Sequence, residues 1–438
     1  MSLQFITGGS GAGKSEYLSR LVCEESVRRP HDNFIVVVPE QYTMETQKKL
    51  VHMHSRKGIL NIDVVSFERL AYKVFEELGG GNRPVLDDTG KNLIVRRVLE
   101  KEKKKLDYFG SSIEKTGFVS ELKSVISELL QYGITPQQLG EIGENVKEKQ
   151  QLSAKLKDIR LVYKEFMAFL STNYITSEEI LDVLCGLVEK SKLIAGSEII
   201  FDGFTGFTPI QYKLMRLLLV YSKGIKISVT IDKKERPTGH ESWNNLFFMS
   251  KEMMNRLIAI CEEEGINVDD TVCVDRDINY RYEGAKDLAY LERNLFRYKG
   301  GVYTGTPENI RIYEGSNPKE ELQYIVSEIL QLTRKEGFRY RDIAVVTADL
   351  ETYGKVAANM MKQNDIPAFL DYKRSVAANP YVEMLCSALE IVEKGYPYDT
   401  MFRYLRTGLT GISRHDIDML ENYCLAVGIR GSRARHEP

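Results

Sequence analysis

Eight consecutive residues near the start of the chain form a complete GxxxxGK[ST] sequence. They are Gly8, Gly9, Ser10, Gly11, Ala12, Gly13, Lys14 and Ser15. The apolar run at residues 3–6 predicts a strand before them, and the apolar spacing of residues 16–22 predicts a helix after them. In such a strand–loop–helix unit, glycines let several N–H groups face one anion, the lysine reaches the β and γ phosphates, and the serine hydroxyl binds Mg²⁺. The sequence therefore predicts a phosphate loop that binds ATP with Mg²⁺.

Strands and helices alternate around this unit. Further strands are predicted at residues 34–38, 62–65, 198–202 and 225–231. Residues 34–38 form a continuous apolar run, which is typical of a parallel strand covered by helices on both faces. A helix is expected at residues 211–221, between the last two strands. This alternation predicts an α/β fold of the P-loop NTPase type.

Six segments make up the predicted domain organisation. Residues 1–84 and 196–304 form the two parts of the first lobe, and residues 85–195 form a helical insertion between them. Within the second part, a helix is expected at residues 243–264, followed by an irregular polar connection to about residue 307.

Beyond the first lobe, residues 305–375 predict a second, incomplete α/β lobe. Its strands are expected near 309–314, 342–347 and 366–370, and its helices at 318–334 and 351–363. Residues 376–431 predict a helical segment, and residues 432–438 predict a disordered tail.

Composition excludes some classes of protein. The formal net charge of −2 gives no overall attraction to nucleic acid, so such binding must come from local patches. The six cysteines form no CxxC pair, and His52 and His54 have no third ligand nearby, which argues against a metal centre. No apolar run is long enough to cross a bilayer, so we expect a cytoplasmic protein without membrane contact.

An acidic residue is expected at the end of a neighbouring strand, where it would hold the Mg²⁺ shell. Asp202 ends the predicted strand at 198–202 and fits this role, together with Ser15. Gly203 and Phe204 follow it, where a hydrolysing motor would carry a second carboxylate. The sequence therefore predicts nucleotide binding with slow hydrolysis and leaves the catalytic residues unknown. The alternative, that Asp202 only caps a strand, stays open.

Several stretches after the predicted strands match superfamily 1 helicases at the positions where these contact DNA. They are VPEQYT at 38–43, VSFERLA at 65–71 and DGFTGFTPIQ at 202–211. Together with FLD at 369–371, NPY at 379–381, YLRTGL at 404–409 and LENY at 420–423, they make the chain resemble the AddB family over nearly all of residues 1–431. AddB is the B-type subunit of the bacterial ATP-dependent helicase–deoxyribonuclease. The resemblance implies a RecA-like first lobe.

The resemblance also implies a role in double-strand break repair by homologous recombination, in a heterodimer with AddA, the helicase–nuclease partner. Family members recognise a hot-spot sequence in the passing single-stranded DNA with their helicase-like half. By motif, the residues that would face this strand are Gln41, Thr43, Phe67, Arg69 and Phe207. Glutamine and arginine can contact base edges, and aromatic rings can stack on bases. Phe67 and Phe207 can equally be core residues, and this alternative stays open.

This sequence differs from the family in one respect. The family is longer, and its C-terminal part carries a nuclease with an iron–sulfur cluster held by cysteines. This sequence has neither a nuclease signature nor the cluster spacing, so we expect neither the exonuclease nor the cluster in this chain.

The leading interpretation is a DNA-binding scaffold that binds ATP and translocates weakly or not at all. An autonomous P-loop motor or a small-molecule P-loop kinase stays the alternative. A kinase would need a lid with clustered arginines, which residues 85–190 do not show.

Overall fold

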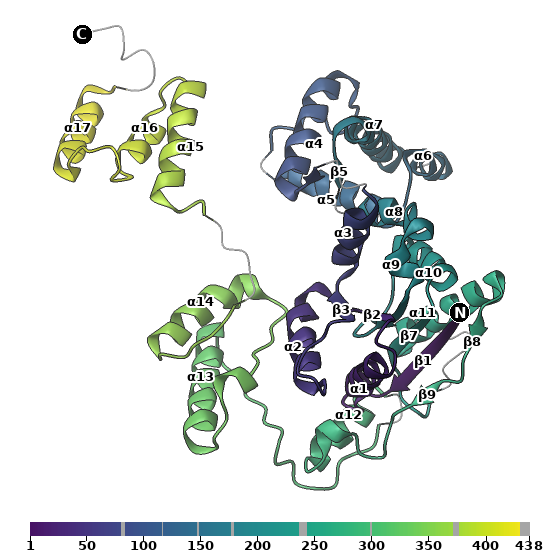
Figure 1. Ribbon diagram of the computed structural model, residues 1–438. Helices are drawn as coiled ribbons and strands as arrows, with labels where there is room; N and C mark the ends of the chain where they lie inside the picture. Colours follow the sequence, from purple (N-terminus) through teal and green to yellow (C-terminus); the bar gives the residue numbers. More distant parts are fainter. Residues whose placement is uncertain are drawn as a thin grey trace. The chain divides into compact units, whose positions relative to one another are not determined.

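The computed structural model describes residues 1–79, 84–115, 117–146, 149–176, 179–235, 243–297, 300–370 and 376–429. The chain divides into two compact units, Met1–Ile310 and Arg311–Pro438, which are described separately (Figure 1). Asp371 and the tail at residues 432–438 lie outside the described residues.

A parallel sheet of seven strands forms the centre of the first unit. Its strands run in the order β3-β2-β6-β7-β1-β8, and β9 pairs with the same edge of β1 as β8. Their bounds are β1 Ser2–Gly8, β2 Asn33–Val37, β3 Ile62–Val65, β6 Ser197–Phe201, β7 Gly224–Thr230, β8 Asn267–Val268 and β9 Val272–Cys273. The predicted α/β fold is confirmed.

Helices cover both faces of this sheet because its strands carry apolar side chains on both sides. Leu3 and Phe5 of β1 belong to the larger core cluster, which includes residues of α3, α10 and α11. Ile6 belongs to a second cluster, which includes residues of α1 and α2. The bounds are α1 Lys14–Arg28, α2 Thr43–Met53, α3 Phe67–Leu78, α10 Pro209–Tyr221 and α11 Phe248–Glu264. This sheet covered on both faces is the arrangement expected for parallel strands.

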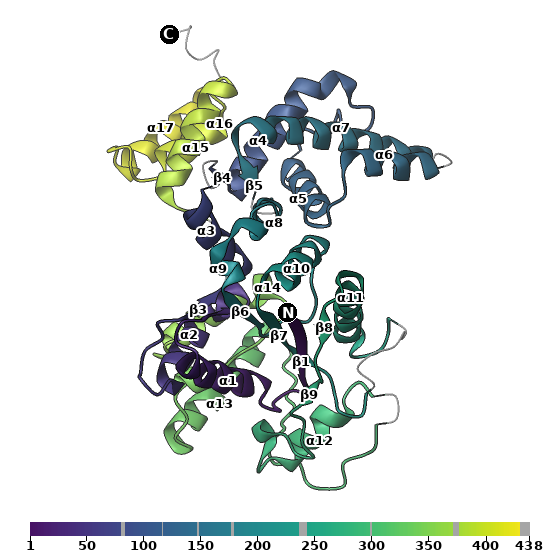
Figure 2. The ribbon, with the colours of Figure 1, turned by 45° about the vertical axis from the view of Figure 1, so that its right-hand side comes forward.

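The insertion between β3 and β6 has its own core. Helices α4, α5 and α7 enclose a separate apolar cluster that includes Val95, Ile126 and Phe166, and Figure 2 shows these helices grouped away from the sheet. The bounds are α4 Asp88–Glu102, α5 Phe118–Gln131, α6 Pro136–Asn145, α7 Gln150–Asn173, α8 Ile180–Cys185 and α9 Lys192–Ala195. Two short strands that were not predicted, β4 Val85–Leu86 and β5 Ile175–Thr176, pair within it. Among the described helices of the chain, none is both long and apolar enough to span a membrane.

The polar region between α11 and residue 307 differs from its prediction as an irregular connection. It contains β8, β9, the short helix η4 Tyr280–Tyr282 and the helix α12 Lys286–Asn294. The two strands are only two residues long each, and they form because β1 offers them a free edge. This region returns the chain to the glycine-rich turn after β1.

In the second unit, the described residues form helices and no strand. Its helices are α13 Pro318–Lys335, α14 Leu350–Gln363, α15 Pro380–Glu393, α16 Tyr398–Leu405 and α17 Arg414–Val427, with the short helix η5 Tyr340–Asp342. The strands predicted near 309–314, 342–347 and 366–370 are absent from the described residues. A strand forms only beside a partner, and these segments leave Ile312, Val346 and Phe369 at 95%, 92% and 90% exposure. The predicted second lobe is therefore not an α/β sheet here.

Candidate functional site

The predicted phosphate loop, residues 8–15, joins the end of β1 to the first turn of α1. Gly11 and Gly13 adopt left-handed backbone angles, with φ of 72° and 94°. Such angles favour glycine, which explains two of the four glycines in the motif. The loop ends directly at the first turn of α1, where free N–H groups and the helix dipole favour an anion.

Lys14 lies against the backbone of its own loop. Its Nζ donates hydrogen bonds of 2.9 Å to the carbonyl oxygens of Gly8 and Gly9. Burial lowers the pKa of the ammonium group below its ordinary value, while the nearby Asp202 and Asp275 carboxylates favour the charged form. The loop therefore holds a partly desolvated cation, which attracts an anion more strongly than an exposed lysine would.

Three strand ends meet at a cavity of about 380 Å³ beside this lysine. Lys14 and Ser15 begin α1, which the loop connects to the end of β1, Asp202 follows β6, and Ser228 and Thr230 belong to β7. The cavity is lined by Ser10, Gly11, Gly13, Lys14, Ser15, Glu16, Lys49, Asp202, Gly203, Phe204, Thr205, Ser228, Thr230 and Arg281. Ser15 and Asp202 are 187 positions apart in the sequence, and both were predicted to bind the same Mg²⁺. The structure brings them together in one cavity. Carboxylate and hydroxyl oxygens are suitable donors for that ion.

Among the described residues that line this cavity, two carry acidic side chains, Glu16 and Asp202. Asp202 Oδ1 accepts a hydrogen bond of 2.5 Å from Ser228 Oγ. Glu16 pairs with Lys49 at 3.1 Å, and the hydrogen bond from Lys49 holds the pKa of Glu16 below its ordinary value. Since Glu16 is engaged with Lys49, the described part of the cavity lining offers no further carboxylate beside Asp202 to orient an attacking water.

Arg281 is a residue of this cavity that sequence reasoning missed. Its backbone N–H donates to the Gly11 carbonyl oxygen and its Nη1 donates to Ser10 Oγ, both at 3.3 Å. An ideal Cβ on Gly11 would lie 2.5 Å from Arg281 Cβ, so only glycine fits at this approach. Arg281 follows the loop by some 270 positions, and no spacing in the sequence connects the two.

A second cavity, of about 650 Å³, adjoins the outer side of the loop. Gly13 and Glu16 line both cavities. The guanidinium carbon of Arg276 lies 3.7 Å from the centroid of the Tyr280 ring in its wall. The lining is Ala12, Gly13, Glu16, Tyr17, Arg20, Cys273, Val274, Asp275, Arg276 and Tyr280.

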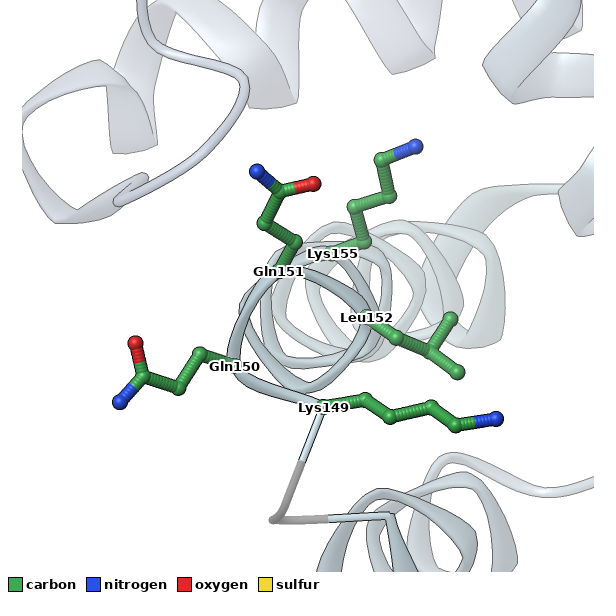
Figure 3. A pocket seen from close by; sticks show the side chains of 5 residues that line it. All are labelled: Lys149, Gln150, Gln151, Leu152 and Lys155. Atoms are coloured by element: carbon green, nitrogen blue, oxygen red, sulfur yellow. The ribbon is translucent and has the colours of Figure 1, made fainter.

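A third hollow at the start of α7 does not form a comparable site. Figure 3 shows its lining side chains, Lys149, Gln150, Gln151, Leu152 and Lys155, spreading outward from the first turns of the helix instead of converging on one point. It offers no preformed arrangement for a ligand.

The residues expected to face single-stranded DNA divide into exposed and buried ones. Gln41 is exposed, and so is Arg69, whose Nε lies 3.0 Å from Glu40 Oε1. Thr43 is buried, and its hydroxyl donates to the Glu40 carbonyl oxygen at 2.9 Å. Tyr42, which the sequence analysis did not single out, exposes 46% of its surface beside Gln41.

Phe67 and Phe207 belong to an aromatic cluster. Phe67 is 8% exposed, and its ring centroid lies 5.4–6.0 Å from those of Phe201, Phe204 and Phe207. Phe207 is half-buried and also contacts Tyr212. In this arrangement the Phe67 ring packs in the core, while Phe204 connects the cluster to the cavity that contains Lys14.

Comparison with known proteins relates the chain to one family. The family model described as "ADDB, N-terminal" matches residues 5–292. A protein of Lachnoclostridium phytofermentans is 42% identical over 100% of this chain and 38% of its own length, and it is named as the B-type subunit of an "ATP-dependent helicase/deoxyribonuclease". Proteins with the same name from Caldanaerobacter subterraneus and Clostridioides difficile are each 37% identical over 99% of this chain and 37% and 38% of their lengths. The chain therefore spans little more than a third of the relatives that it matches.

Proposed function

Because this chain belongs to the AddB family, we propose that it is the ATP-binding, helicase-like part of a B-type helicase–nuclease subunit, which acts in double-strand break repair by homologous recombination. The observation that carries this proposal is the meeting of Lys14, Ser15, Asp202 and Arg281 around one cavity. Two cations face the position of a triphosphate there, and a carboxylate and a hydroxyl face the position of its metal.

The nucleotide occupies the two adjoining cavities. The phosphates lie against the loop amides, where Lys14 exchanges its bonds to the Gly8 and Gly9 carbonyl oxygens for phosphate oxygens. Arg281, which contacts Ser10 and Gly11 of the loop and lines the same cavity, reaches the same phosphates. The base lies in the second cavity near Tyr17 and Tyr280, whose rings offer apolar contact without a fixed hydrogen-bond pattern. Base selectivity is therefore loose.

Ser15 and Asp202 would hold Mg²⁺ through the nucleotide, and the bound ion would supply positive charge to neutralise the phosphates. Ser228 orients the Asp202 carboxylate toward that position. Since the lining residues that the structure describes include no further free carboxylate beside Asp202, we expect the attacking water to be activated poorly. ATP is therefore bound firmly and hydrolysed slowly.

Single-stranded DNA passes along the ends of β2 and β3. Gln41 and Arg69 reach the base edges there, and Tyr42 offers an exposed ring for stacking. Thr43, Phe67 and Phe207 support this surface from behind. We further propose that the strand is delivered by AddA, the helicase–nuclease partner, and that the surface reads a hot-spot sequence with little translocation of its own.

ATP turnover with and without single-stranded DNA tests this function. We expect saturable MgATP binding, low turnover and little stimulation by DNA, with binding lost in Lys14→Ala. Strong stimulation by single strands would instead identify an autonomous motor, and transfer of the γ-phosphate to a metabolite would identify a kinase.

A further inference from the structure

The segment between β9 and the end of α12 forms hydrogen bonds with the backbone of Ser10 in the predicted phosphate loop. Ser10 N–H donates a hydrogen bond of 3.2 Å to Glu292 Oε1. On the other side of the same residue, Asn279 Nδ2 donates to the Ser10 carbonyl oxygen at 3.3 Å. Both backbone polar groups of Ser10 are therefore held by residues about 270 to 280 positions later in the chain. The loop conformation depends on these contacts as well as on its glycines.

Glu292 itself is held in place because α12 is fixed near both ends. At the first turn, Asp287 accepts hydrogen bonds of 2.9 Å from Glu308 N–H and 2.7 Å from Asn309 N–H. At the last turn, the Arg293 guanidinium donates to the Arg276 carbonyl oxygen. The helix is thus a rigid support that sets the position of the Glu292 carboxylate.

The fit of this carboxylate against the loop is close. An ideal Cβ on Gly9 would lie 3.2 Å from Glu292 Oε1 and 3.1 Å from Asn279 Nδ2, so a larger residue at position 9 would displace both. The backbone angles of Gly9 do not require glycine, because its φ is not positive. The close contact with Glu292 and Asn279 explains why a residue without a side chain is favoured there.

The negative charge of Glu292 is unfavourable in its surroundings. Burial raises the pKa of its carboxyl group, and the Asp275 and Asp232 carboxylates raise it further, against the opposing effects of the Ser10 N–H and of Arg293. A negative charge behind the loop also repels a bound triphosphate. Its useful contribution must therefore be the acceptor oxygen that fixes Ser10.

We propose that Glu292 is a positioning residue of the nucleotide site: it fixes the Ser10 amide, and through it the loop that cradles the phosphates, without touching the nucleotide. This inference rests on the proposed function. Glutamine at position 292 keeps the acceptor oxygen and removes the charge, so it should preserve or improve nucleotide affinity. Alanine removes both and should loosen the loop.

Three variants of the whole chain test the proposal: Glu292→Ala, Glu292→Gln and, as a control for loss of a negative charge, Glu262→Ala, an exposed position on α11. Loss of the hydrogen bond should weaken MgATP binding roughly tenfold in Glu292→Ala. Glu292→Gln and Glu262→Ala should bind at least as tightly as the unmodified chain. Equal affinity in all variants, or equal weakening in the alanine and glutamine variants at position 292, would overturn the proposal.

A second measurement separates this proposal from the proposed function. Amide hydrogen exchange at Ser10, measured without nucleotide, should be faster in Glu292→Ala than in Glu292→Gln. If the unmodified chain does not bind MgATP, the proposed function fails, and the exchange result still decides whether Glu292 fixes Ser10. Unchanged protection of Ser10 in Glu292→Ala would overturn the positioning role whatever the nucleotide affinity.

Discussion

Ser228 Oγ donates a hydrogen bond of 2.5 Å to Asp202 Oδ1 and accepts one of 3.3 Å from Gly203 N–H. One hydroxyl of β7 therefore fixes both the carboxylate at the end of β6 and the backbone turn that follows it. Ser228 is 4% exposed, so a lost bond here is not replaced readily by solvent. This pair defines the part of the cavity where the metal is proposed to lie.

Ser228→Ala should weaken Mg²⁺-dependent nucleotide binding. Removing the hydroxyl frees the Asp202 carboxylate to rotate, with a loss of about 1 kcal/mol, or roughly fivefold in affinity. Titration with a fluorescent nucleotide in Mg²⁺ and in EDTA measures the effect. Ser124→Ala, an exposed substitution on α5, is the matched control. An equal loss in EDTA would mean that Ser228 acts on the loop and not through the metal.

Gln41→Ala combined with Arg69→Ala should reduce sequence preference in DNA binding. Each well-placed contact to a base edge contributes about 1–3 kcal/mol of discrimination. Binding to a preferred oligonucleotide, selected from a random library, should therefore fall at least tenfold more than binding to random strands. An equal loss of affinity for the preferred oligonucleotide and for random strands would mean that the two residues contact only the DNA backbone.

Glu40→Gln tests the same surface, but here we expect stronger binding to single-stranded DNA. Glu40 pairs with the exposed Arg69 at 3.0 Å, and such exposed ion pairs contribute little to stability. Removing the carboxylate should therefore leave folding unchanged and strengthen binding to any single strand a few-fold at low salt, because Arg69 becomes free to meet a phosphate. Weaker binding would contradict the placement of DNA over Arg69.

Phe67→Ala distinguishes a core role from base stacking. The ring is 8% exposed and packs against three other phenylalanines, so its removal should lower the free energy of unfolding by about 3–5 kcal/mol. Urea unfolding measures this, with Phe67→Leu as the milder control. If stability changes little while oligonucleotide binding is lost, the ring acts on DNA.

The Glu292 carboxyl group makes stability depend on pH. Its pKa is raised above the ordinary value of 4.5, chiefly by burial, so the folded state holds the proton more tightly than the unfolded state. The contribution of this raised pKa to the free energy of unfolding is fully present below pH 4.5. It is lost as the pH rises through the folded-state pKa of Glu292. The melting temperature of Glu292→Gln, measured without nucleotide, should therefore rise relative to that of the unmodified chain between about pH 4 and about pH 8. A difference that stays constant would contradict the raised pKa.

Much of the first unit could be predicted from the sequence because its signals are local. The strand predicted at residues 62–65 coincides with β3, and the loop glycines correctly marked the turn from β1 to α1. β8, β9 and α12 escaped prediction because the two strands are two residues long each and the helix is only nine residues long. They are held by distant partners, such as the edge of β1 and the contact of Glu292 with Ser10.

The opposite error occurred in the second unit. Residues 342–347 have an apolar pattern typical of a strand, yet Val346 is 92% exposed and the segment has no ladder partner among the described residues. A sequence pattern indicates which segments could pair, but a strand also needs a neighbour. For the candidate site, the sequence pattern predicted Lys14, Ser15 and Asp202, which line one cavity, whereas the contacts of Arg281 and Glu292 with the loop appear only in the folded chain.

Isothermal titration of MgATP into the unmodified chain and into Lys14→Ala shows whether the loop binds a triphosphate, with melting temperature as the check on folding. Lys14 provides the cation of the loop itself, so we expect saturable binding at one site per chain that is lost in the variant while the fold is kept. Equal heats of binding in the two proteins, or no binding to the unmodified chain, would mean that this loop does not hold a nucleotide.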